Sequence, residues 1–215
     1  MTQTPSIIVV DNFYSNPMEV REFILKQDFP VTGQFPGYRT EQPYATHKVR
    51  DLIQSYIEPF GMEIDRFPLS GDHNGKFQYT TAEHRSWIHT DTRDNMAGVL
   101  YMTPDAPFSA GTGFYRPKGS EVPVCHTRPP WERNGLSGSA STPPFFCHHR
   151  EEHDGRDITK WDLVDQVGNV FNRLVLYNSH MWHTSMDYFG DCKENGRLFQ
   201  VFFFSIKKKD KASNV

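Results

Sequence analysis

The spacing of hydrophobic residues changes near residue 76, and this change constrains the fold more than any other feature of the sequence. Upstream of it, two segments carry apolar residues at the three- and four-residue spacing of an amphipathic helix. Downstream, short aromatic or β-branched segments are separated by turn residues, which is the pattern of β-strands. The sequence therefore predicts an α+β fold, with N-terminal helices against one face of a mainly antiparallel sheet or double sheet.

The expected elements can be placed by residue number. A β-branched run predicts a strand over 7–10, and helices are expected over 17–25 and 47–58. Pro17 suits the first position of a helix, and Pro59 stops the second one. Further strands are expected over 76–81, 86–92, 97–103, 111–116, 173–178 and 197–206.

The composition favours the same interpretation. Aromatic residues make up 14% of the chain, and 15 prolines and 15 glycines accompany them, a mixture that suits short strands joined by turns. Residues 29–47 are dense in proline and glycine and are expected to be loop. At 215 residues the chain is long enough for one sizeable core, so we expect a single domain over 1–215 with a jelly roll as its β part.

Charge and hydropathy argue against several classes of function. The formal net charge is −3, so no global basic surface supports nucleic-acid binding. Hydrophobic residues make up 37% of the chain without a long apolar run, which argues against a membrane protein. The N-terminal residues show no secretory signal, and three cysteines do not suggest a disulfide framework, so a cytoplasmic location is expected.

One long segment, about forty residues over 117–159, shows little periodicity. Such segments are usually functional lids or disordered insertions, and we expect this one to border the functional site. It contains a cluster of possible zinc ligands, namely Cys147, His148, His149 and His153. Because the cluster lacks the paired spacing of a zinc finger, we interpret it as part of a solvated loop, with substrate recognition as the alternative.

The segment RSWIHTDTRD, residues 85–94, holds His89 and Asp91 with one residue between them. On a strand, residues i and i+2 project to the same side, so both side chains could face a metal while Thr90 faces away. A His-x-Asp pair alone is more often an ordinary polar pair. It becomes informative only if a second histidine and a suitable cation lie downstream.

Candidates for both are present. His180 and His183 follow a strongly apolar segment, and Arg197 opens the last expected strand fourteen residues after His183. Two imidazoles and one carboxylate on one face of an iron leave positions open for a chelating cosubstrate and O₂. An arginine on a neighbouring strand can hold a carboxylate through two parallel hydrogen bonds, a geometry that lysine cannot reproduce.

The elements HTD, NSHMWH and GRLFQVFFF resemble those of Fe(II)/2-oxoglutarate-dependent oxygenases, which have a double-stranded β-helix fold. More narrowly, VVDNFYSNPMEVREFIL, FPGYRT, GTGFYRPK and FNRLVLYNS are similar to segments of small bacterial and phage oxygenases of uncharacterised substrate. The similarity runs over most of the chain. It implies a distorted, cupin-like jelly roll with flanking N-terminal helices, and it implies Fe(II), 2-oxoglutarate and O₂ as reaction partners.

The resemblance also implies roles for residues. His89, Asp91 and His183 would be the catalytic metal ligands, because the family pattern Asn-Ser-x-x-x-His favours His183 over His180. Arg197 would hold the distal carboxylate of 2-oxoglutarate. Further residues expected in the cosubstrate pocket are Trp87, two positions before the first ligand, and Tyr79, Gln78 and Tyr101. For the last three, burial in the aromatic core is the alternative interpretation.

The implied function is a dioxygenase that hydroxylates an amino acid, a peptide or another small metabolite. Asp91 favours hydroxylation over halogenation, because halogenases of this type replace the carboxylate to make room for halide. Two alternatives remain open. One is a cupin-type iron dioxygenase without 2-oxoglutarate, in which Arg197 would have no cosubstrate to hold. The other is a catalytically silent binding protein of the same fold. The sequence leaves the oligomeric state open.

Overall fold

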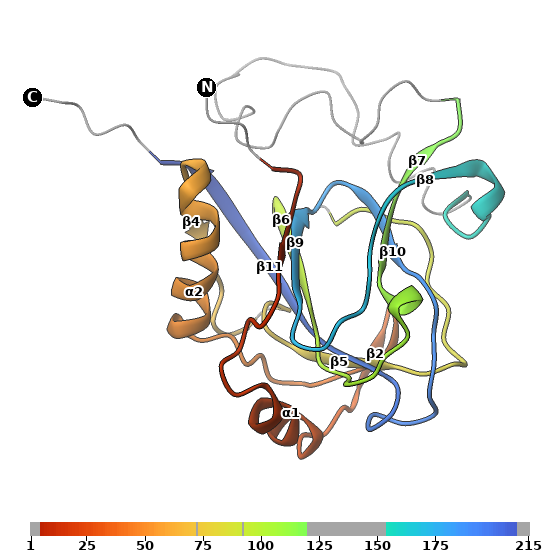
Figure 1. Ribbon diagram of the computed structural model, residues 1–215, viewed down its shortest axis with the longest axis horizontal. Coiled ribbons are helices and arrows are strands. Elements are labelled where there is room, and N and C mark those ends of the chain that lie inside the picture. The colour runs from red at the N-terminus through yellow and green to blue at the C-terminus, as the bar shows by residue number, and fades with distance from the viewer. Residues whose placement is uncertain (1–4, 72, 92, 120–153, 210–215) are drawn as a thin grey trace, which may run out of the picture.

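The computed structural model describes residues 5–71, 73–91, 93–119 and 154–209, which form helices and two antiparallel sheets (Figure 1). The helices are α1 (Pro17–Leu25) and α2 (His47–Ile57), with short 3₁₀ turns η1 (Glu58–Phe60), η2 (Phe108–Ala110) and η4 (Ile158–Lys160). The strands are β1 (Ile7–Val10), β2 (Val31–Gly33), β3 (Phe35–Arg39), β4 (Met62–Arg66), β5 (Phe77–Thr80), β6 (Met96–Tyr101), β7 (Thr112–Pro117), β8 (Trp161–Val167), β9 (Leu174–Asn178), β10 (Trp182–Ser185) and β11 (Arg197–Lys208). None of the described helices has the length and apolar character needed to cross a membrane.

The strands form a large and a small sheet. The large sheet has the order β1-β9-β6-β11-β5-β3-β2, with β4 paired to the far end of β11, and the small sheet has the order β10-β7-β8. In Figure 1 the small sheet lies on one side of β6, β9 and β11, and helix α2 lies on the other. These two facing antiparallel sheets with flanking helices confirm the predicted α+β fold with a double-stranded β-helix core.

The helices cover the outer face of the large sheet because each presents an apolar stripe to it. Ile24 of α1 and Ile53 of α2 are fully buried in one cluster with Leu198 and Phe202 of β11. Thr46 caps the N-terminus of helix α2, because its hydroxyl accepts a hydrogen bond from the Val49 amide at 3.2 Å. Helix α1 begins at Pro17 as expected.

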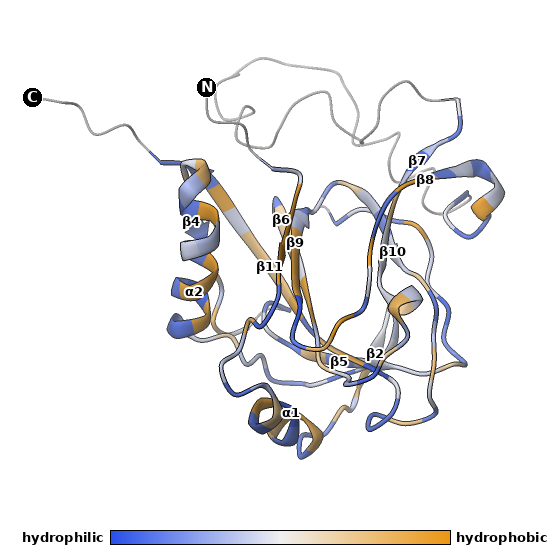
Figure 2. Cartoon of the chain, viewed as in Figure 1, coloured by the Kyte–Doolittle hydropathy of each residue, from blue (hydrophilic) through white to orange (hydrophobic). Residues whose placement is uncertain are grey.

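Alternation along β11 divides its side chains between the two faces of the sheet. This strand is mostly hydrophobic over its length (Figure 2). Leu198, Phe202, Phe204 and Ile206 pack toward the helices, whereas Arg197, Phe199, Val201 and Phe203 line a cavity on the other face. Since strand side chains have a period of two, a single register places the arginine and three apolar residues on the inner face together.

Most of the predicted elements are present, and several predictions are wrong. Residues 29–47, expected to be loop, contain β2 and β3, which pair with each other and, through β3, with β5. Residues 86–91, expected to be a strand, form only an isolated bridge at His89. Strands β4, β8 and β10 were not predicted. The long segment 117–159, with its cysteine and histidine cluster, lies outside the described residues from 120 to 153.

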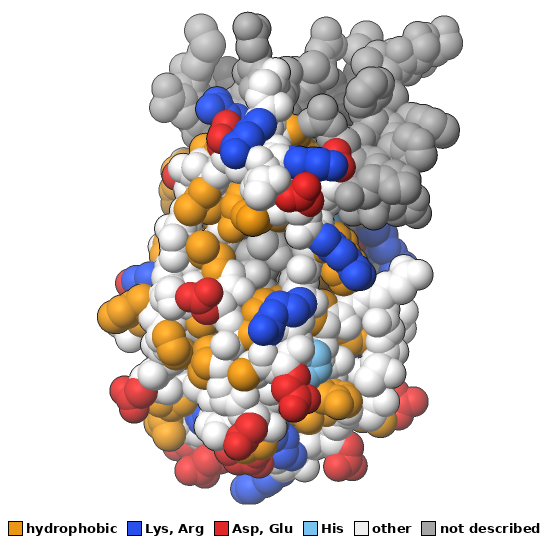
Figure 3. Space-filling model, turned by 90° about the vertical axis from the view of Figure 1, so that its right-hand side faces the viewer, with side chains coloured by type: hydrophobic (Ala, Val, Ile, Leu, Met, Phe, Trp, Pro, Cys, Tyr) orange, Lys and Arg blue, Asp and Glu red, His pale blue; other side chains and the backbone are white. Residues whose placement is uncertain are grey.

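The surface shown in Figure 3 carries Lys and Arg side chains interspersed with Asp and Glu. The described part of that face therefore has no continuous basic patch. This distribution agrees with the formal net charge of −3.

Gly37 in β3 offers a test of the pairing between β3 and β5. Its φ is +81°, and a Cβ there would lie 2.0 Å from the Tyr79 carbonyl oxygen. Gly71 also has a positive φ, +67°, but no described atom lies within 4 Å of its Cβ position. We expect Gly71→Ala to lower Tm by about 2–8 °C, the effect of left-handed backbone strain alone.

We expect Gly37→Ala to lower Tm further than Gly71→Ala, because β3 must also move away from β5. Thermal denaturation followed by circular dichroism measures both. Equal shifts in the two variants would contradict the close approach of these strands.

Candidate metal centre

An isolated β-bridge brings two of the candidate ligands, His89 and His183, together. The His89 amide donates to the His183 carbonyl at 3.0 Å, and the His183 amide donates to the His89 carbonyl at 2.9 Å. The Asp91 amide donates to the Ser179 carbonyl at 2.8 Å. Residues 89–91 therefore lie along the segment 179–183, and the centroids of the two imidazole rings are 4.5 Å apart.

Both imidazoles are oriented by backbone carbonyls. His89 Nδ1 lies 2.8 Å from the Trp87 carbonyl oxygen, and His183 Nδ1 lies 2.8 Å from the Met181 carbonyl oxygen. Because a carbonyl oxygen can only accept, Nδ1 must carry the proton in each ring. The neutral tautomer then leaves Nε2 of each ring with a free lone pair, which is the arrangement that a metal-binding histidine requires.

Asp91 completes the group. Its Oδ2 lies 3.4 Å from His183 Nε2, and one ligand atom from each of the three residues lies within 4.8 Å of the others. Among the residues that the structure describes, this is the one group of three or more His, Cys, Asp or Glu side chains close enough to hold a metal. The structure thus brings together three of the residues singled out in the sequence: His183, and not His180, joins His89 and Asp91.

The charges of these groups respond to burial. Desolvation, reinforced by the neighbouring His89, lowers the pKa of His183 to about 3, so this imidazole is neutral at physiological pH. Burial raises the pKa of the Asp91 carboxyl, while His89, Arg39 and His180 oppose that rise. A divalent cation bound here would favour the ionised carboxylate and would bind the neutral imidazole.

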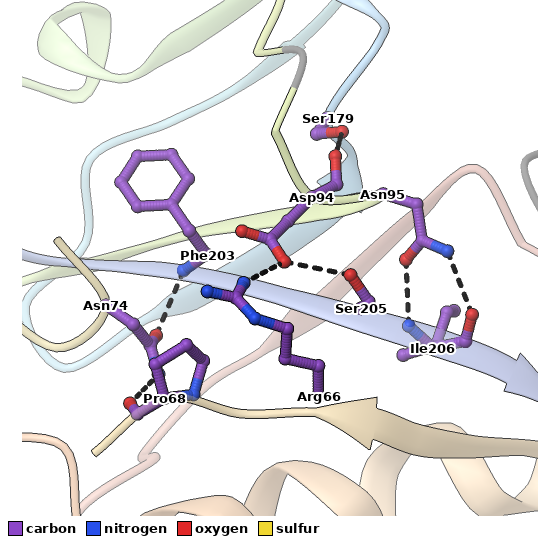
Figure 4. A network of polar contacts seen from close by, with 9 residues as sticks. All are labelled: Arg66, Pro68, Asn74, Asp94, Asn95, Ser179, Phe203, Ser205 and Ile206. Atoms are coloured by element: carbon purple, nitrogen blue, oxygen red, sulfur yellow. Dashed lines mark hydrogen bonds and ion pairs between the residues drawn. The ribbon is translucent and has the colours of Figure 1, made fainter. Parts of the chain in front are cut away.

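A network of hydrogen bonds fixes Asp94 and Asn95, which follow Asp91 closely in the sequence (Figure 4). The Asp94 carboxylate accepts from Arg66 Nη1 at 2.6 Å and from the Ser205 hydroxyl at 2.8 Å, and the Asp94 carbonyl accepts from the Ser179 hydroxyl. The Asn95 side chain bonds the backbone amide and carbonyl of Ile206, both at 2.8 Å. These bonds join residues 94–95 to β11 and to the segment before His183, and so they limit how far Asp91 can move.

The three candidate ligands line a cavity of about 500 Å³ between the two sheets. Its wall also contains Trp87, Gln78, Thr112 and Arg197, together with aromatic and aliphatic residues of β6, β9 and β11. A volume of this size suits a small-molecule site, which typically measures about 300–1,000 Å³.

Arg197 is 1% exposed and lies on the inner face of the large sheet. Its Nε donates to the Ala110 carbonyl at 3.0 Å, and the ring of Phe199 lies 4.4 Å from its guanidinium carbon. Its Nη1 is buried and makes no hydrogen bond to any described residue. A buried guanidinium donor without a partner is costly, so an anionic ligand on this side of Arg197 would satisfy it.

The donor set therefore fits the two groups that the resemblance to Fe(II)/2-oxoglutarate-dependent oxygenases implied. Two neutral imidazole nitrogens and one carboxylate suit Fe(II), and the unpaired Nη1 in the same cavity suits a carboxylate of 2-oxoglutarate.

The other residues expected in the cosubstrate pocket have different positions. Trp87 and Gln78 line the cavity. Tyr79 does not, because the alternation of β5 that turns Gln78 inward turns Tyr79 to the helical face, where it stacks on Tyr38 at 5.2 Å. Tyr101 is buried beside the cavity wall, and its hydroxyl lies 2.7 Å from the Thr112 hydroxyl. Its ring centroid also lies 5.3 Å from the guanidinium carbon of Arg197, so Tyr101 contacts two residues of the cavity wall.

Several cavity residues were not predicted from the sequence. Arg39 lies at the end of β3, a strand that was not predicted. Tyr177 of β9 contacts the His183 ring, with ring centroids 4.7 Å apart. Tyr177 lies two positions after Val175 on the same strand, so the period of two could have placed both side chains on the inner face. Thr90, expected to face away from the metal, is buried and also lines the cavity.

Comparisons with known proteins agree with this fold. HygX from Streptomyces hygroscopicus, in a crystal structure with nickel and 2-oxoglutarate bound, is 12% identical, and the match covers 92% of this chain and 82% of that chain with a TM-score of 0.53. A prolyl hydroxylase from Trichoplax adhaerens, in complex with a hypoxia inducible factor peptide fragment, is 11% identical, with 94% and 84% covered and a TM-score of 0.49. At these identities the likeness to HygX shows a shared fold alone.

Sequence comparison gives a family without an assigned activity. No curated protein matches the chain. Residues 1–204 match the model of a family described as a family of unknown function, DUF6445. Since this match covers most of the sequence, the chain belongs to the DUF6445 family.

Proposed function

We propose that this protein is an Fe(II)- and 2-oxoglutarate-dependent dioxygenase that hydroxylates a small molecule or a peptide, and that residues 1–215 act as one domain. One observation carries the proposal. The group His89, Asp91 and His183 shares a cavity with the buried, unpaired Nη1 of Arg197. A metal site alone would suit many reactions, whereas a metal site facing an unpaired guanidinium suits a chelating dicarboxylate.

The fold supports this proposal. HygX, which shares the fold, was crystallised with nickel and 2-oxoglutarate. In the present chain His89, Asp91 and His183 would hold the iron, and Arg197 would hold the distal carboxylate of 2-oxoglutarate. The iron, when bound with 2-oxoglutarate and O₂, would supply the oxidising chemistry, with succinate and CO₂ as coproducts.

The chain's own residues have positioning and shielding roles. The carbonyls of Trp87 and Met181 hold Nδ1 of each ring, which leaves both Nε2 atoms available to one metal ion. Phe199, Val201 and Phe203 give the cavity an apolar wall that limits access of water. Because Asp91 supplies a carboxylate to the ligand set, the proposed outcome is hydroxylation and not halogenation.

The proposal is tested by measuring succinate formed from 2-oxoglutarate by the purified protein in air, without added substrate. We expect slow succinate formation that requires Fe(II) and that stops when a chelator is added. Oxygen consumption with iron but without 2-oxoglutarate would instead identify an iron-only dioxygenase. Absence of both activities, together with absence of 2-oxoglutarate binding, would leave a binding protein of the same fold.

A further inference from the structure

Arg39 is a second buried cation in the cavity, and the proposed reaction does not use it. It ends β3, is 8% exposed and lines the same cavity as the candidate metal ligands. Burial lowers the pKa of its guanidinium to about 10, opposed by the nearby Asp91, so it remains protonated at neutral pH. A protonated guanidinium in this cavity requires an anion to neutralise it.

The orientation of Arg39 is fixed by neutral groups. Its Nε and Nη2 both donate to Gln78 Oε1, at 2.9 and 2.5 Å, and Gln78 Nε2 donates to the Pro36 carbonyl at 2.6 Å. The guanidinium carbon lies 3.8 Å from the centroid of the Phe35 ring. One edge of the guanidinium is therefore occupied by an amide, and its remaining donor, Nη1, bonds no described residue.

No carboxylate among the described residues forms an ion pair with Arg39. Asp91 is close enough to influence it, but that carboxylate belongs to the proposed metal site. Asp94, the other acidic residue of the wall, is paired with Arg66 at 2.6 Å. Arg39 is thus a buried charge whose partner is missing from the described protein, and buried charges are normally paired.

The charge balance of the site with Fe(II) and 2-oxoglutarate bound also indicates that Arg39 lacks a counterion. The charges of Fe(II) and Arg197 would be balanced by Asp91 and the two carboxylates of 2-oxoglutarate. Arg39 would then still lack a counterion. A substrate that carries one carboxylate would neutralise it and would form charge-assisted hydrogen bonds with its free edge.

We propose that Arg39 binds the carboxylate of the primary substrate, so that the substrate is a small organic acid whose apolar body lies against Phe35, Phe199 and Phe203. This inference rests on the proposed function, because it takes Asp91 as a metal ligand. Gln78 is a positioning residue in this scheme: it holds the guanidinium without neutralising it.

The test uses phenylacetate and its neutral analogue phenylacetamide, which share one apolar ring and differ in charge. Each is titrated by calorimetry, without oxygen, into protein loaded with Fe(II) and saturating 2-oxoglutarate. We expect the wild type to bind phenylacetate at least about tenfold more tightly than phenylacetamide, since only the acid pairs with Arg39. Arg39→Gln should remove this preference.

Gln78→Glu provides a matched variant that keeps Arg39 in place. A carboxylate at the position of Oε1 would pair with the Arg39 guanidinium inside the protein, so the preference for phenylacetate should also disappear. Arg116→Gln, which changes an exposed arginine paired with Asp162 at 3.4 Å, should keep the preference. A merely structural Arg39 would not give the same loss in both cavity variants.

The failure of this inference is distinguishable from failure of the proposed function. The metal-to-ligand charge-transfer band of the Fe(II) and 2-oxoglutarate complex tests the proposed function, because it forms only when both are bound. The phenylacetate and phenylacetamide titrations are also repeated without metal. If the band forms but the wild type has no preference for the acid, or Arg39→Gln keeps it, the inference is wrong. If Arg39→Gln weakens 2-oxoglutarate binding itself, Arg39 belongs to the cosubstrate site and the inference is also wrong. If the band never forms but an Arg39-dependent preference persists without metal, Arg39 is an organic-acid site and the dioxygenase proposal falls.

Discussion

Replacing His183 by alanine is expected to lower Fe(II) affinity by at least about 100-fold, because the change removes one of three ligands around the proposed metal. The remaining pair, His89 and Asp91, would bind a divalent cation only weakly. Anaerobic calorimetric titration of Fe(II) into the purified variant measures this directly. The same titration in His89→Ala and Asp91→Ala should show losses of similar size, since each of these residues supplies one ligand atom to the group.

His180→Ala is the matched control for His183→Ala. His180 lies three residues earlier, but it does not belong to the ligand group, so its replacement should leave Fe(II) affinity within a few-fold of the wild type. Full affinity in His183→Ala together with loss in His180→Ala would show that the ligand assignment is wrong.

Unfolding must be separated from loss of a ligand in this experiment. His183 is 5% exposed, and its removal leaves the Met181 carbonyl without its donor, at a cost of about 1–3 kcal/mol. For a chain of this size that corresponds to a fall in Tm of about 2–12 °C. His183→Gln keeps a polar side chain of similar length, and circular dichroism of both variants checks that the fold survives.

The hydrophobic pattern predicted those elements whose own residues determine their structure. β6, β9 and β11 have apolar side chains on both faces, since helices cover one face and the small sheet faces the other. Such runs are recognisable without knowledge of their partners. The two helices were predicted for the same reason, because the apolar stripes, the proline at the start of α1 and the proline after α2 are local features.

The elements that were missed depend on distant partners. β3 reads FPGYR, in which proline and glycine argue against a strand, yet it pairs with β5 at an edge where Gly37 fits against the Tyr79 carbonyl. β10 is four residues long and is recognisable only by its pairing with β7. Arg39 was missed along with β3, since its position in the cavity follows from that pairing.

Alternation explains the success and the failure among the candidate pocket residues. Neighbours on a strand point to opposite faces, so Gln78 and Tyr79 cannot both line one cavity. The sequence shows that alternation but not which of the two faces is the inner one. The proximity of His89 to His183 is a different case, because their bridge joins segments more than ninety residues apart. Only resemblance to a family could suggest that pairing beforehand.

Replacing Arg197 by lysine or alanine is expected to weaken 2-oxoglutarate binding while Fe(II) affinity stays close to the wild type. Lysine keeps the charge but lacks the planar fork that binds a carboxylate through two parallel hydrogen bonds, and alanine removes both. Loss of a buried, charged hydrogen-bonding partner costs about 2–5 kcal/mol, so affinity should fall at least about tenfold, and further in Arg197→Ala.

The measurement is a titration of 2-oxoglutarate into the anaerobic Fe(II) protein, followed by the metal-to-ligand charge-transfer band. Arg173→Lys is the control, because Arg173 makes a two-point contact with Asp11, at 2.6 and 2.9 Å, outside the cavity wall. It should lose some stability but no cosubstrate affinity. Arg197→Lys retains a donor near the Ala110 carbonyl, so it separates a folding defect from a binding defect better than alanine does. If both Arg197 variants bound 2-oxoglutarate as tightly as the wild type, the buried Nη1 would have no role in the cosubstrate site, and the iron-only dioxygenase would become the favoured hypothesis.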